Sequence, residues 1–314
     1  MVGGGLATHC KHDKQRLDGV TQEMQKPLIG VIGGSGVYQF EGLENAVWKD
    51  VTSSFGEPSD AVLMGEVEGC RLAFLPRHGR GHHLSPTDIN YRANIDALKR
   101  LGVTDIISIS AVGSLREDLA PGTFVIVDQF IDRTFAREKT FFGKGLVAHV
   151  SMGHPVCGRL GDHVEEAAKA AAIKVVRKGT YITMEGPQFS SVAESNLYRS
   201  WGCSVVGMTN MPEAKLAREA EICYATVAMV TDYDCWHPDH DHVQVEDVIR
   251  VLQENAHNAQ ALVKTVAPLL QGRPSACPHG CDRVLDAAII TPPHARDKQR
   301  VAELDAVAGR VLNS

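Results

Sequence analysis

Short apolar runs alternate with amphipathic segments along most of the chain. The apolar runs are rich in Ile, Val and Ala, which predicts strands that are covered on both faces. They span residues 28–32, 71–75, 105–110, 123–128, 204–208 and 222–230. Hydrophobic residues at helical spacing predict helices at 88–101, 160–172, 191–201, 212–220 and 243–270. This alternation predicts an α/β fold, a single domain whose mixed, largely parallel central sheet is flanked by helices.

Both ends of the chain lack this pattern. Residues 1–27 are polar and contain no periodic apolar face, which predicts a flexible N-terminal arm. Gly272 and Pro274 follow the last long helix and predict its end. Residues 272–314 are then expected to form a C-terminal appendage with a short helix, whose apolar face carries Val301, Leu304, Val307 and Val311. The domain between the two ends is expected at 28–271.

Composition excludes several classes of protein. The 314 residues are 44% hydrophobic and 22% charged, as in a globular protein with a full core, and the net charge of -6 gives no basic footprint for nucleic acid. No apolar run approaches the roughly 18–20 residues that span a bilayer, so no membrane partner is expected. The first residues contain no apolar segment typical of a secretory signal. A cytoplasmic location is therefore expected.

The eight cysteines are expected to be free thiols. One pair, Cys277 and Cys281, stands in the sequence CPHGC. A metal site there needs further ligands that the sequence does not place, so a surface turn is the expected structure and no metal is predicted.

A glycine-rich loop, Gly33-Gly34-Ser35-Gly36, follows the first strand. Such a loop brings backbone N–H groups and the Ser35 hydroxyl close to an anion, because glycine has no Cβ to block the approach. Gln39 stands where a dinucleotide-binding fingerprint has its third glycine, and no Gly-Lys-Ser/Thr ending follows. An anion site or a simple tight turn remain the two interpretations.

A second loop, residues 76–83, follows the strand at 71–75 and is strongly basic. Arg77 and Arg80 offer planar groups that suit phosphate oxygens, and His78, His82 and His83 add tunable donors. The arginines disfavour a metal ion. An oxyanion site is therefore a plausible function for this loop, with a solvated basic loop as the alternative.

Two further strands end in small or acidic residues. Ser110 to Ser114 contains small side chains, which permit a ligand to approach the backbone or mark a plain transition from strand to loop. Asp232 and Asp234 follow the strand at 222–230, where burial beside an apolar pocket raises the pKa of a carboxylate. Such a carboxyl group can deliver a proton, although turn formation is the alternative role.

Seven motifs in this order resemble the trimeric purine nucleoside phosphorylase superfamily, over roughly residues 28–270. They are Gly33–Gly36, Arg77–Arg80, Asn90–Asn94, Ser110–Ser114, Met184–Ser190, Gly207–Thr209 and Thr231–Asp234. Within the superfamily the chain is most similar to the branch that acts on 5′-methylthioadenosine. The resemblance implies a pentosyltransferase that cleaves the nucleoside with inorganic phosphate to adenine and 5-methylthioribose 1-phosphate. It also implies a homotrimer and no cofactor, with phosphate as the co-substrate.

The resemblance further implies the role of each site residue. Phosphate would be held by Ser35, Arg77, His78, Ser110, Ala111 and Thr209. The nucleoside would contact Phe189, Ser190, Met208, Asp232, Asp234, Val245, Val248, Ile249 and, from a neighbouring subunit, His149. The catalytic groups would be Asp232, Asp234 and His78. In this scheme protonated Asp232 donates to N7 of the purine.

Base preference follows from the same positions. Members acting on 6-oxopurines carry Glu and Asn where this chain has Ser190 and Asp232, and an Asp can accept a hydrogen bond from the exocyclic amine of adenine. Gly207 and Ser35 depart from the Asn and Thr of the animal enzymes, and Gly207-Met208-Thr209 also resembles a branch that prefers methylthioinosine. A 6-oxopurine nucleoside or methylthioinosine phosphorylase is therefore the alternative enzyme. A purine-binding sensor on the same fold is the alternative outside enzymes, and a nicotinamide-dependent oxidoreductase is more distant.

Overall fold

The centre of the molecule is an 11-stranded mixed sheet within the part of the chain that is described. The structure is a computed structural model that describes residue 1 and residues 27–34, 40, 42–238 and 245–313. Its strands are β1 (Leu28–Gly33), β2 (Glu44–Lys49), β3 (Val62–Val67), β4 (Cys70–Pro76), β5 (Val103–Ser114), β6 (Phe124–Val127), β7 (Gln129–Arg133), β8 (Val175–Arg177), β9 (Thr180–Met184), β10 (Val205–Gly207) and β11 (Cys223–Asp232). They are ordered β2-β3-β4-β1-β5-β10-β9-β7, while β11 pairs with β5 and β6, and β8 pairs with β6.

Four neighbouring strands, β4, β1, β5 and β11, run parallel. Ile32 of β1 lies opposite Leu75 of β4 and Ser108 of β5, and Ser110 lies opposite Ala228 of β11. Because parallel strands end at one edge of a sheet, the segments that follow β1, β4 and β11 meet at that edge. This is where the glycine loop, the basic loop and the Asp232 segment begin.

Strand β5 is longer than the sequence predicted. Its first part pairs in parallel with β1, whereas Gly113 and Ser114 pair antiparallel with Val206 and Val205 of β10. The interpretation of residues 110–114 as a transition to a loop is therefore wrong. The small side chains here permit two differently directed neighbours to approach one strand.

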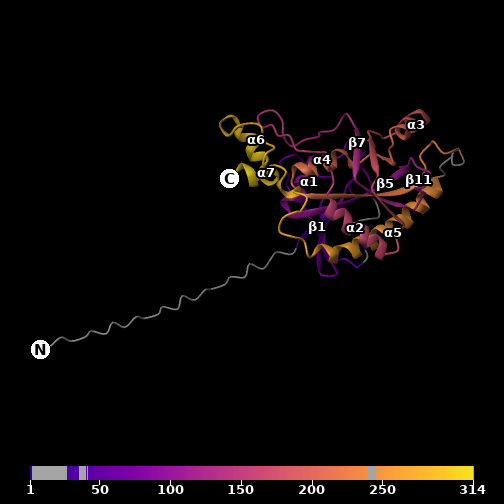
Figure 1. Cartoon of the computed structure of the whole chain (residues 1–314), viewed down its shortest axis with the longest axis horizontal. Helices are drawn as coiled ribbons and strands as arrows, with labels where there is room; N and C mark the ends of the chain where they lie inside the picture. The colour runs from indigo at the N-terminus through magenta and orange to yellow at the C-terminus, as the bar shows by residue number, and fades with distance from the viewer. Residues whose placement is uncertain (2–26, 35–39, 41, 239–244, 314) are drawn as a thin grey trace.

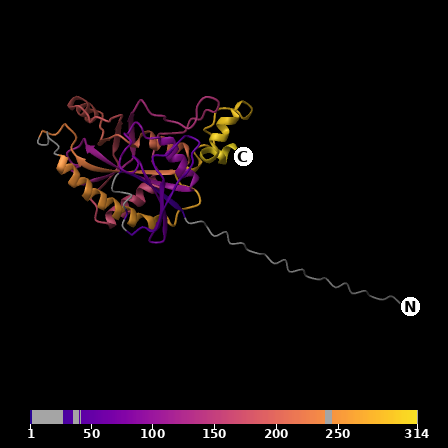
Figure 2. The same ribbon diagram turned by 180° about the vertical axis from the view of Figure 1, so that it is seen from behind.

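Helices cover both faces of the sheet (Figures 1 and 2). They are α1 (Tyr91–Arg100), α2 (Gly158–Ala170), α3 (Val192–Ser200), α4 (Asn210–Glu219), α5 (Val245–Leu270), α6 (Lys298–Glu303) and α7 (Asp305–Leu312). Helices α2 and α5 bury Leu160, Leu262 and Val266 against one face, and α1 and α4 bury Ile95 and Leu216 against the other. The helix predictions and the α/β fold class are confirmed, with ends shifted by up to three residues.

The C-terminal segment packs on the domain instead of projecting from it. The residues of the expected apolar face are divided between two helices, because α6 ends and α7 begins at Leu304. Leu304 and Val307 are buried in the same core cluster as α1. Arg100 of α1 pairs with Asp305 at 2.5 Å, and Arg310 of α7 pairs with Glu221 at 2.6 Å. These contacts fix α7 beside α1.

The sequence missed β2, β3, β7, β8 and β9, which have three to six residues each. Every residue of β2 is exposed, and all three residues of β8 are half-buried, so neither strand carries the continuous apolar pattern of a covered strand.

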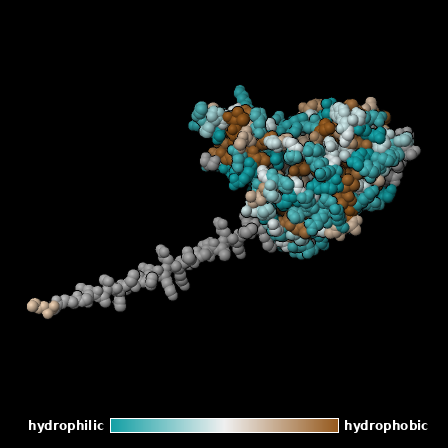
Figure 3. All heavy atoms as spheres, viewed as in Figure 1, coloured by the Kyte–Doolittle hydropathy of each residue, from teal (hydrophilic) through white to brown (hydrophobic). Residues whose placement is uncertain are grey.

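The face in Figure 3 is mainly hydrophilic, with hydrophobic residues gathered near α6 and α7. Within the described ranges, none of the helices combines the length and the apolar character needed to cross a membrane.

Candidate functional site

Arg77 leaves the end of β4 and turns its guanidinium into the protein. Its Nε donates to Glu213 Oε2 at 2.8 Å, and one terminal nitrogen donates to the carbonyl of Ile109 at 2.9 Å. The other terminal nitrogen donates to Ser108 Oγ at 2.7 Å. With the side chain 1% exposed, this group is a buried ion pair beneath the sheet edge. The Arg77 guanidinium is therefore hydrogen-bonded to groups of the protein itself. This geometry does not favour the expected direct contact between Arg77 and phosphate oxygens.

Arg80 is also engaged by a carboxylate. Its guanidinium binds Asp60 at 2.8 Å and lies 4.2 Å from the centre of the Trp48 ring. Half of the Arg80 side chain is exposed, so this pair resembles the solvated alternative for the basic loop.

A buried polar network continues from Arg77 to the hydroxyl groups of the predicted phosphate site. Glu213 accepts hydrogen bonds from Ser108 at 2.5 Å and from Tyr224 at 2.8 Å. Asn210, at the start of α4, donates to Ser108 and accepts from Ser110 Oγ at 2.9 Å. This network fixes β4, β5 and α4 relative to one another, and places Ser110 beside the beginning of α4.

Thr209 precedes α4 and is buried, and its side chain makes no capping hydrogen bond to the helix. The helix start and the Ser110 and Thr209 hydroxyls therefore lie at one edge of the sheet. The backbone is extended at Met211, so regular helix geometry does not begin beside Thr209. The hydroxyl groups of Ser110 and Thr209 are the donors by which this arrangement can hold a phosphate group. Ala111, predicted for the same site, is exposed on β5.

His78 is held as a neutral ring by burial and by one hydrogen bond. Its Nδ1 lies 2.9 Å from the carbonyl of Leu84, which requires the proton on Nδ1 and leaves Nε2 as an acceptor. Burial, with a smaller contribution from the neighbouring Arg77 charge, lowers the pKa of His78 to about 4, although the hydrogen bond to the Leu84 carbonyl acts to raise it. The ring stacks on His82 with centroids 4.2 Å apart. Neutral His78 can accept a hydrogen bond from a protonated oxygen of a phosphate ion.

Asp232 and Asp234 stand at the end of β11 and fold back toward each other. Asp232 accepts hydrogen bonds from Thr231 Oγ1 at 2.6 Å and from the Asp234 N–H at 2.8 Å. Burial raises the pKa of Asp232, although these hydrogen bonds oppose the increase. Burial also raises the pKa of Asp234, and the Asp232 charge adds to it. Both interpretations from the sequence therefore apply: the two acids form a turn, and the pKa of each is raised.

One buried carboxylate oxygen of Asp234 accepts no hydrogen bond from the described residues. Its Oδ2 has no hydrogen bond of good geometry within the described ranges, although the Ser190 and Ser195 hydroxyls lie near and lower its pKa. A buried oxygen of this kind costs free energy unless a ligand supplies a donor. The amine of a purine is one such donor.

Two glycines permit this arrangement. A Cβ on Gly113 would lie 3.1 Å from both Asp232 Oδ1 and Asp234 Cβ, so glycine permits the two acids to fold over β5. A Cβ on Gly207 would lie 1.9 Å from the Tyr181 hydroxyl oxygen. The backbone fixes the position of a Cβ, so no choice of side-chain rotamer at position 207 would relieve this clash. Gly207 is therefore required by Tyr181, whatever it contributes to base preference.

The segment around Met208 is held by Arg137, which the sequence did not indicate. Arg137 donates to the carbonyls of Met208 at 2.6 Å and Met211 at 2.8 Å, and pairs with Glu185 at 3.0 Å. Burial opposes the charge of Glu185, but hydrogen bonds from Thr87 and from the Phe135 and Ala136 N–H groups lower its pKa to about 2. This fixed pair positions the Met208 backbone.

The structure places the remaining predicted nucleoside residues unevenly. Ser190 is buried and close to Asp234, whereas Phe189 is 85% exposed. Ser35 and the N-terminal arm, apart from its end residues 1 and 27, lie outside the described residues. The backbones of Val245, Val248 and Ile249 belong to α5, but their side chains lie outside the described part.

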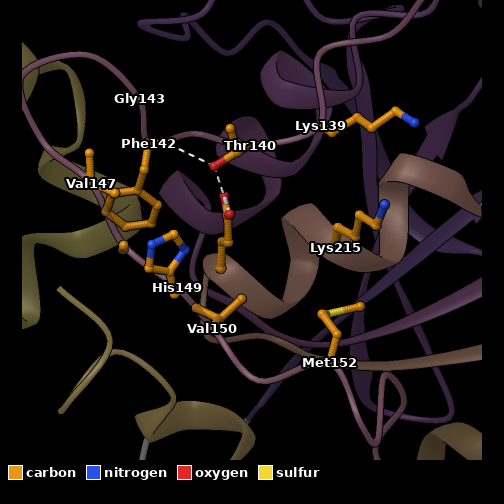
Figure 4. A pocket seen from close by; sticks show the side chains of 11 residues that line it. Lys139, Thr140, Phe142, Gly143, Val147, His149, Val150, Met152 and Lys215 are labelled. Atoms are coloured by element: carbon orange, nitrogen blue, oxygen red, sulfur yellow. Dashed lines mark hydrogen bonds between the residues drawn. The ribbon is translucent and has the colours of Figure 1, made fainter. Parts of the chain in front are cut away.

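His149 lies apart from these groups within its own chain. It lines a cavity of about 380 Å³ together with Phe142, Val150, Lys215 and Glu219 (Figure 4). Phe142 and His149 lie together on one side of this cavity, and Lys139 and Lys215 on the other. Glu219 is the last residue of α4, whereas Thr209 precedes the first, so His149 lies toward the opposite end of this kinked helix from the hydroxyls that are predicted to bind phosphate.

Four residues that position the candidate site were not singled out from the sequence: Arg137, Glu185, Asn210 and Glu213. Glu185 carries a signal because it lies within the recognised motif Met184–Ser190, and Asn210 and Glu213 carry a weaker one because they follow the motif Gly207–Thr209. Their partners lie far along the chain, so only the fold identifies the pairs.

Comparison with known proteins identifies the family of this chain. The model of the phosphorylase superfamily matches residues 28–268. The chain belongs to the phosphorylase superfamily. The superfamily match covers the whole sheet and its flanking helices up to residue 268, near the end of α5, and it leaves α6 and α7 outside.

Relatives named as phosphorylases cover nearly the whole chain. S-methyl-5′-thioadenosine phosphorylase of Rhodospirillum rubrum is 66% identical over 293 residues, which are 93% of this chain and 100% of that protein. The protein of the same name from Cereibacter sphaeroides is 63% identical over 287 residues, 91% of this chain and 99% of the relative.

Solved structures agree at the level of the fold. Methylthioadenosine phosphorylase from an antarctic soil metagenomic library has a TM-score of 0.86 at 47% identity, covering 90% of this chain and 99% of that one. Methylthioadenosine phosphorylase from Schistosoma mansoni in complex with tubercidin has a TM-score of 0.74 at 36% identity, covering 79% and 93%. The resemblance found in the motifs is thus confirmed.

Proposed function

We propose that this chain cleaves 5′-methylthioadenosine with inorganic phosphate, releasing adenine and 5-methylthioribose 1-phosphate. The observation that carries the proposal is the pair of acids at the end of β11, Asp234 buried and Asp232 half-buried, both with raised pKa, near the Ser110 and Thr209 hydroxyls. The names of the relatives support the same activity.

Phosphate would bind between the two hydroxyls, the start of α4 and His78. Thr209 can donate to its oxygens, and Ser110 would turn its hydroxyl hydrogen from Asn210 Oδ1 to phosphate. Neutral His78 can accept a hydrogen bond from a protonated phosphate oxygen through Nε2. Ser35, Arg77 and Ala111 complete the proposed set. The Arg77 guanidinium would act mainly through Glu213 and Ser108, which position the hydroxyls.

The departing base would be protonated by Asp232. Breaking the N-glycosidic bond places negative charge on the purine, and a neutral carboxyl group can donate a hydrogen bond or a proton to N7. Asp234 would accept from the exocyclic amine through its open Oδ2. A 6-oxopurine offers an acceptor at that position and would face a second acceptor, which favours adenine.

Met208, Phe189 and Ser190 would line the sugar and base, and Val245, Val248 and Ile249 would surround the methylthio group. Burying that group adds roughly 1–2 kcal/mol over a 5′-hydroxyl, so kcat/KM for methylthioadenosine should exceed that for adenosine by tens-fold at most. A preference for adenosine would contradict this pocket.

His149 and the oligomer are proposed together. His149 lies at the far end of α4 from the phosphate hydroxyls of its own chain, so it would serve a neighbouring subunit of a homotrimer. Exposed Phe135, Phe189 and Trp201 are apolar surface that a second copy would cover.

A panel of nucleosides assayed with and without inorganic phosphate tests the proposal. We expect phosphate-dependent release of adenine from methylthioadenosine and slow release of base from 6-oxopurine nucleosides. Faster cleavage of methylthioinosine would support the alternative enzyme. Binding without phosphate-dependent release would support the purine sensor. The proposed chemistry needs no metal or organic cofactor, so activity should survive treatment with a chelator at low temperature.

A further inference from the structure

Four cysteines from three separate segments converge at one buried point. Cys157 precedes α2, Cys223 begins β11, and Cys277 and Cys281 belong to the C-terminal segment. All four are buried, at 1%, 0%, 6% and 1% exposure respectively. Residues 278–280 form the expected surface turn and are exposed, but the side chains of Cys277 and Cys281 on either side of it are buried. The two ligands that the sequence could not place, Cys157 and Cys223, are supplied by the folded domain.

The distances among the four sulfur atoms fit one metal ion. All four Sγ atoms lie within 4.8 Å of one another, and Cys157 Sγ lies 3.7 Å from Cys277 Sγ. A zinc ion with four bonds to sulfur of about 2.3 Å has sulfur atoms about 3.8 Å apart at the corners of its tetrahedron. A disulfide requires about 2.0 Å, so the 3.7 Å pair is unbonded.

The local sequence and backbone suit a metal loop. Cys277 and Cys281 are separated by three residues, within the spacing of zinc ligands that share a turn. Gly280 has a φ of 65° before Cys281, and its N–H donates to the Cys277 carbonyl at 2.9 Å. The Cys277 N–H is bound by Asp282 at 2.8 Å. The turn is therefore closed by its own backbone, with both thiols directed inward to the other two.

Positive charge surrounds the thiols. Arg218 lies 3.4 Å from Cys281 Sγ, and Arg273 lies 4.0 Å from Cys223 Sγ. Arg159 and Arg273 share one buried carboxylate, Asp105, and Arg273 also lies 3.8 Å from Asp282. Together with Arg218, three guanidinium groups beside the thiols face these two carboxylates. Thiolates bound to a metal would supply the missing negative charge.

We propose that Cys157, Cys223, Cys277 and Cys281 bind one zinc ion in a closed tetrathiolate site that fastens the C-terminal segment to the phosphorylase domain. With four protein ligands the site has no open position for substrate, so its role is structural. It ties residues 277–281 to the starts of α2 and β11, and thereby supports the docking of α7 on α1. The proposal does not depend on the proposed function.

Metal analysis of the full-length chain is the primary test. The protein is purified with a thiol reductant and passed into metal-free buffer, and zinc and iron are measured per chain. We expect about one zinc ion per chain, because a closed thiolate site retains its metal through such exchange. Blocking the thiols with an organomercurial in the presence of a zinc indicator should release the same amount. Cobalt(II) in place of zinc should give the strong visible absorption of tetrahedral thiolate coordination.

Matched variants localise the metal. Cys277→Ser together with Cys281→Ser should abolish bound zinc, whereas Cys203→Ser should keep it, since Cys203 is a buried thiol outside the cluster. The double variant should also lose thermal stability while its kcat/KM at low temperature stays near that of the parent. If the double variant fails to fold, the organomercurial release from the parent protein still decides the question.

Other outcomes would overturn the proposal. Zinc at background level in the reduced parent protein would exclude the site. Disulfides between these cysteines, found by mass spectrometry of the protein as isolated, would replace the metal by covalent crosslinks. Iron in place of zinc would contradict the metal identity. Failure of any of these tests leaves phosphate-dependent cleavage untouched, so the two proposals fail separately.

Discussion

Arg77 and Glu213 form a fully buried ion pair directly beneath the predicted phosphate site. Arg77 Nε lies 2.8 Å from Glu213 Oε2, with side-chain exposures of 1% and 2%. Glu213 also accepts from Ser108 and Tyr224, so one carboxylate joins β4, β5, α4 and β11. The pair positions the hydroxyl groups that would bind phosphate, and this role separates it from the exposed Arg80–Asp60 pair.

Removing the charge of Glu213 tests this role. Glu213→Gln leaves Arg77 as a buried charge without its partner, and should lower the free energy of unfolding by about 3–5 kcal/mol. The KM for phosphate should rise more than the KM for the nucleoside, because Ser108 and Asn210 lose their fixed positions. Urea denaturation and steady-state kinetics measure the two effects.

Asp60→Asn is the matched control, since it removes the carboxylate charge from the solvent-exposed pair with Arg80. This substitution should lower the free energy of unfolding by less than about 1 kcal/mol and leave the KM for phosphate unchanged. Equal effects of the two substitutions would mean that burial of the Arg77 pair has no special role.

The predictions from sequence succeeded where local pattern determines structure. Apolar runs located β1, β5 and β11, and Ser191 with Glu194 forms the capping box that begins α3. Residues 110–114 were misassigned because their small side chains resemble a loop, and the pairing of Gly113 with β10 is not visible in the local sequence.

The candidate site was predictable where its residues lie within motifs, and not where it depends on distant partners. Asp232 and Asp234 could be found because they follow a strongly apolar strand. The partner of Arg77 stands 136 positions away, and only the assembled sheet brings them together. The same limit applies to Cys157 and Cys277, which are 120 positions apart.

The pKa of Asp232 sets the expected pH dependence of catalysis. Burial raises this pKa, so the acid form persists to higher pH than in an exposed Asp. If that form protonates the base, kcat/KM should decline as pH rises through the raised pKa. Asp232→Asn should remove this decline and keep part of the activity with altered base preference, while Asp232→Ala should lose about 10²–10⁴-fold. An Asp232→Asn enzyme with unchanged turnover and unchanged adenine preference would contradict the role.

Glu219 should make the stability of the protein depend on pH. Burial raises its pKa to about 7, against hydrogen bonds from the Phe141 N–H and Thr140. The folded protein therefore binds this proton more tightly than the unfolded chain. The resulting stabilisation is complete below the unfolded pKa of about 4.5 and is lost as pH rises through about 7, an amount on the order of 3 kcal/mol.

Glu219→Gln keeps the hydrogen-bond acceptor and removes the titration. Urea denaturation at pH 5 and pH 8 should show a smaller loss of stability with rising pH in the variant than in the parent. Thr140→Val is the control, because it removes one hydrogen bond to Glu219 and leaves the carboxyl group free to titrate. Identical pH dependence in the parent and in Glu219→Gln would assign the effect to other groups.

The position of His149 predicts complementation between two inactive variants. His149 lies near the end of α4 and Asp232 at the end of β11, so the proposed trimer would combine His149 of one subunit with Asp232 of the next. His149→Ala and Asp232→Ala should each lose activity toward methylthioadenosine. In every mixed trimer, one of the three sites lies between an intact Asp232 and a neighbour's intact His149 and is restored, so about a third of the sites in the isolated mixed trimers are complete. Co-expression with two affinity tags isolates the mixed trimers, and each variant expressed alone is the control. Activity no greater than that of the separate variants would mean that His149 does not act across the subunit interface.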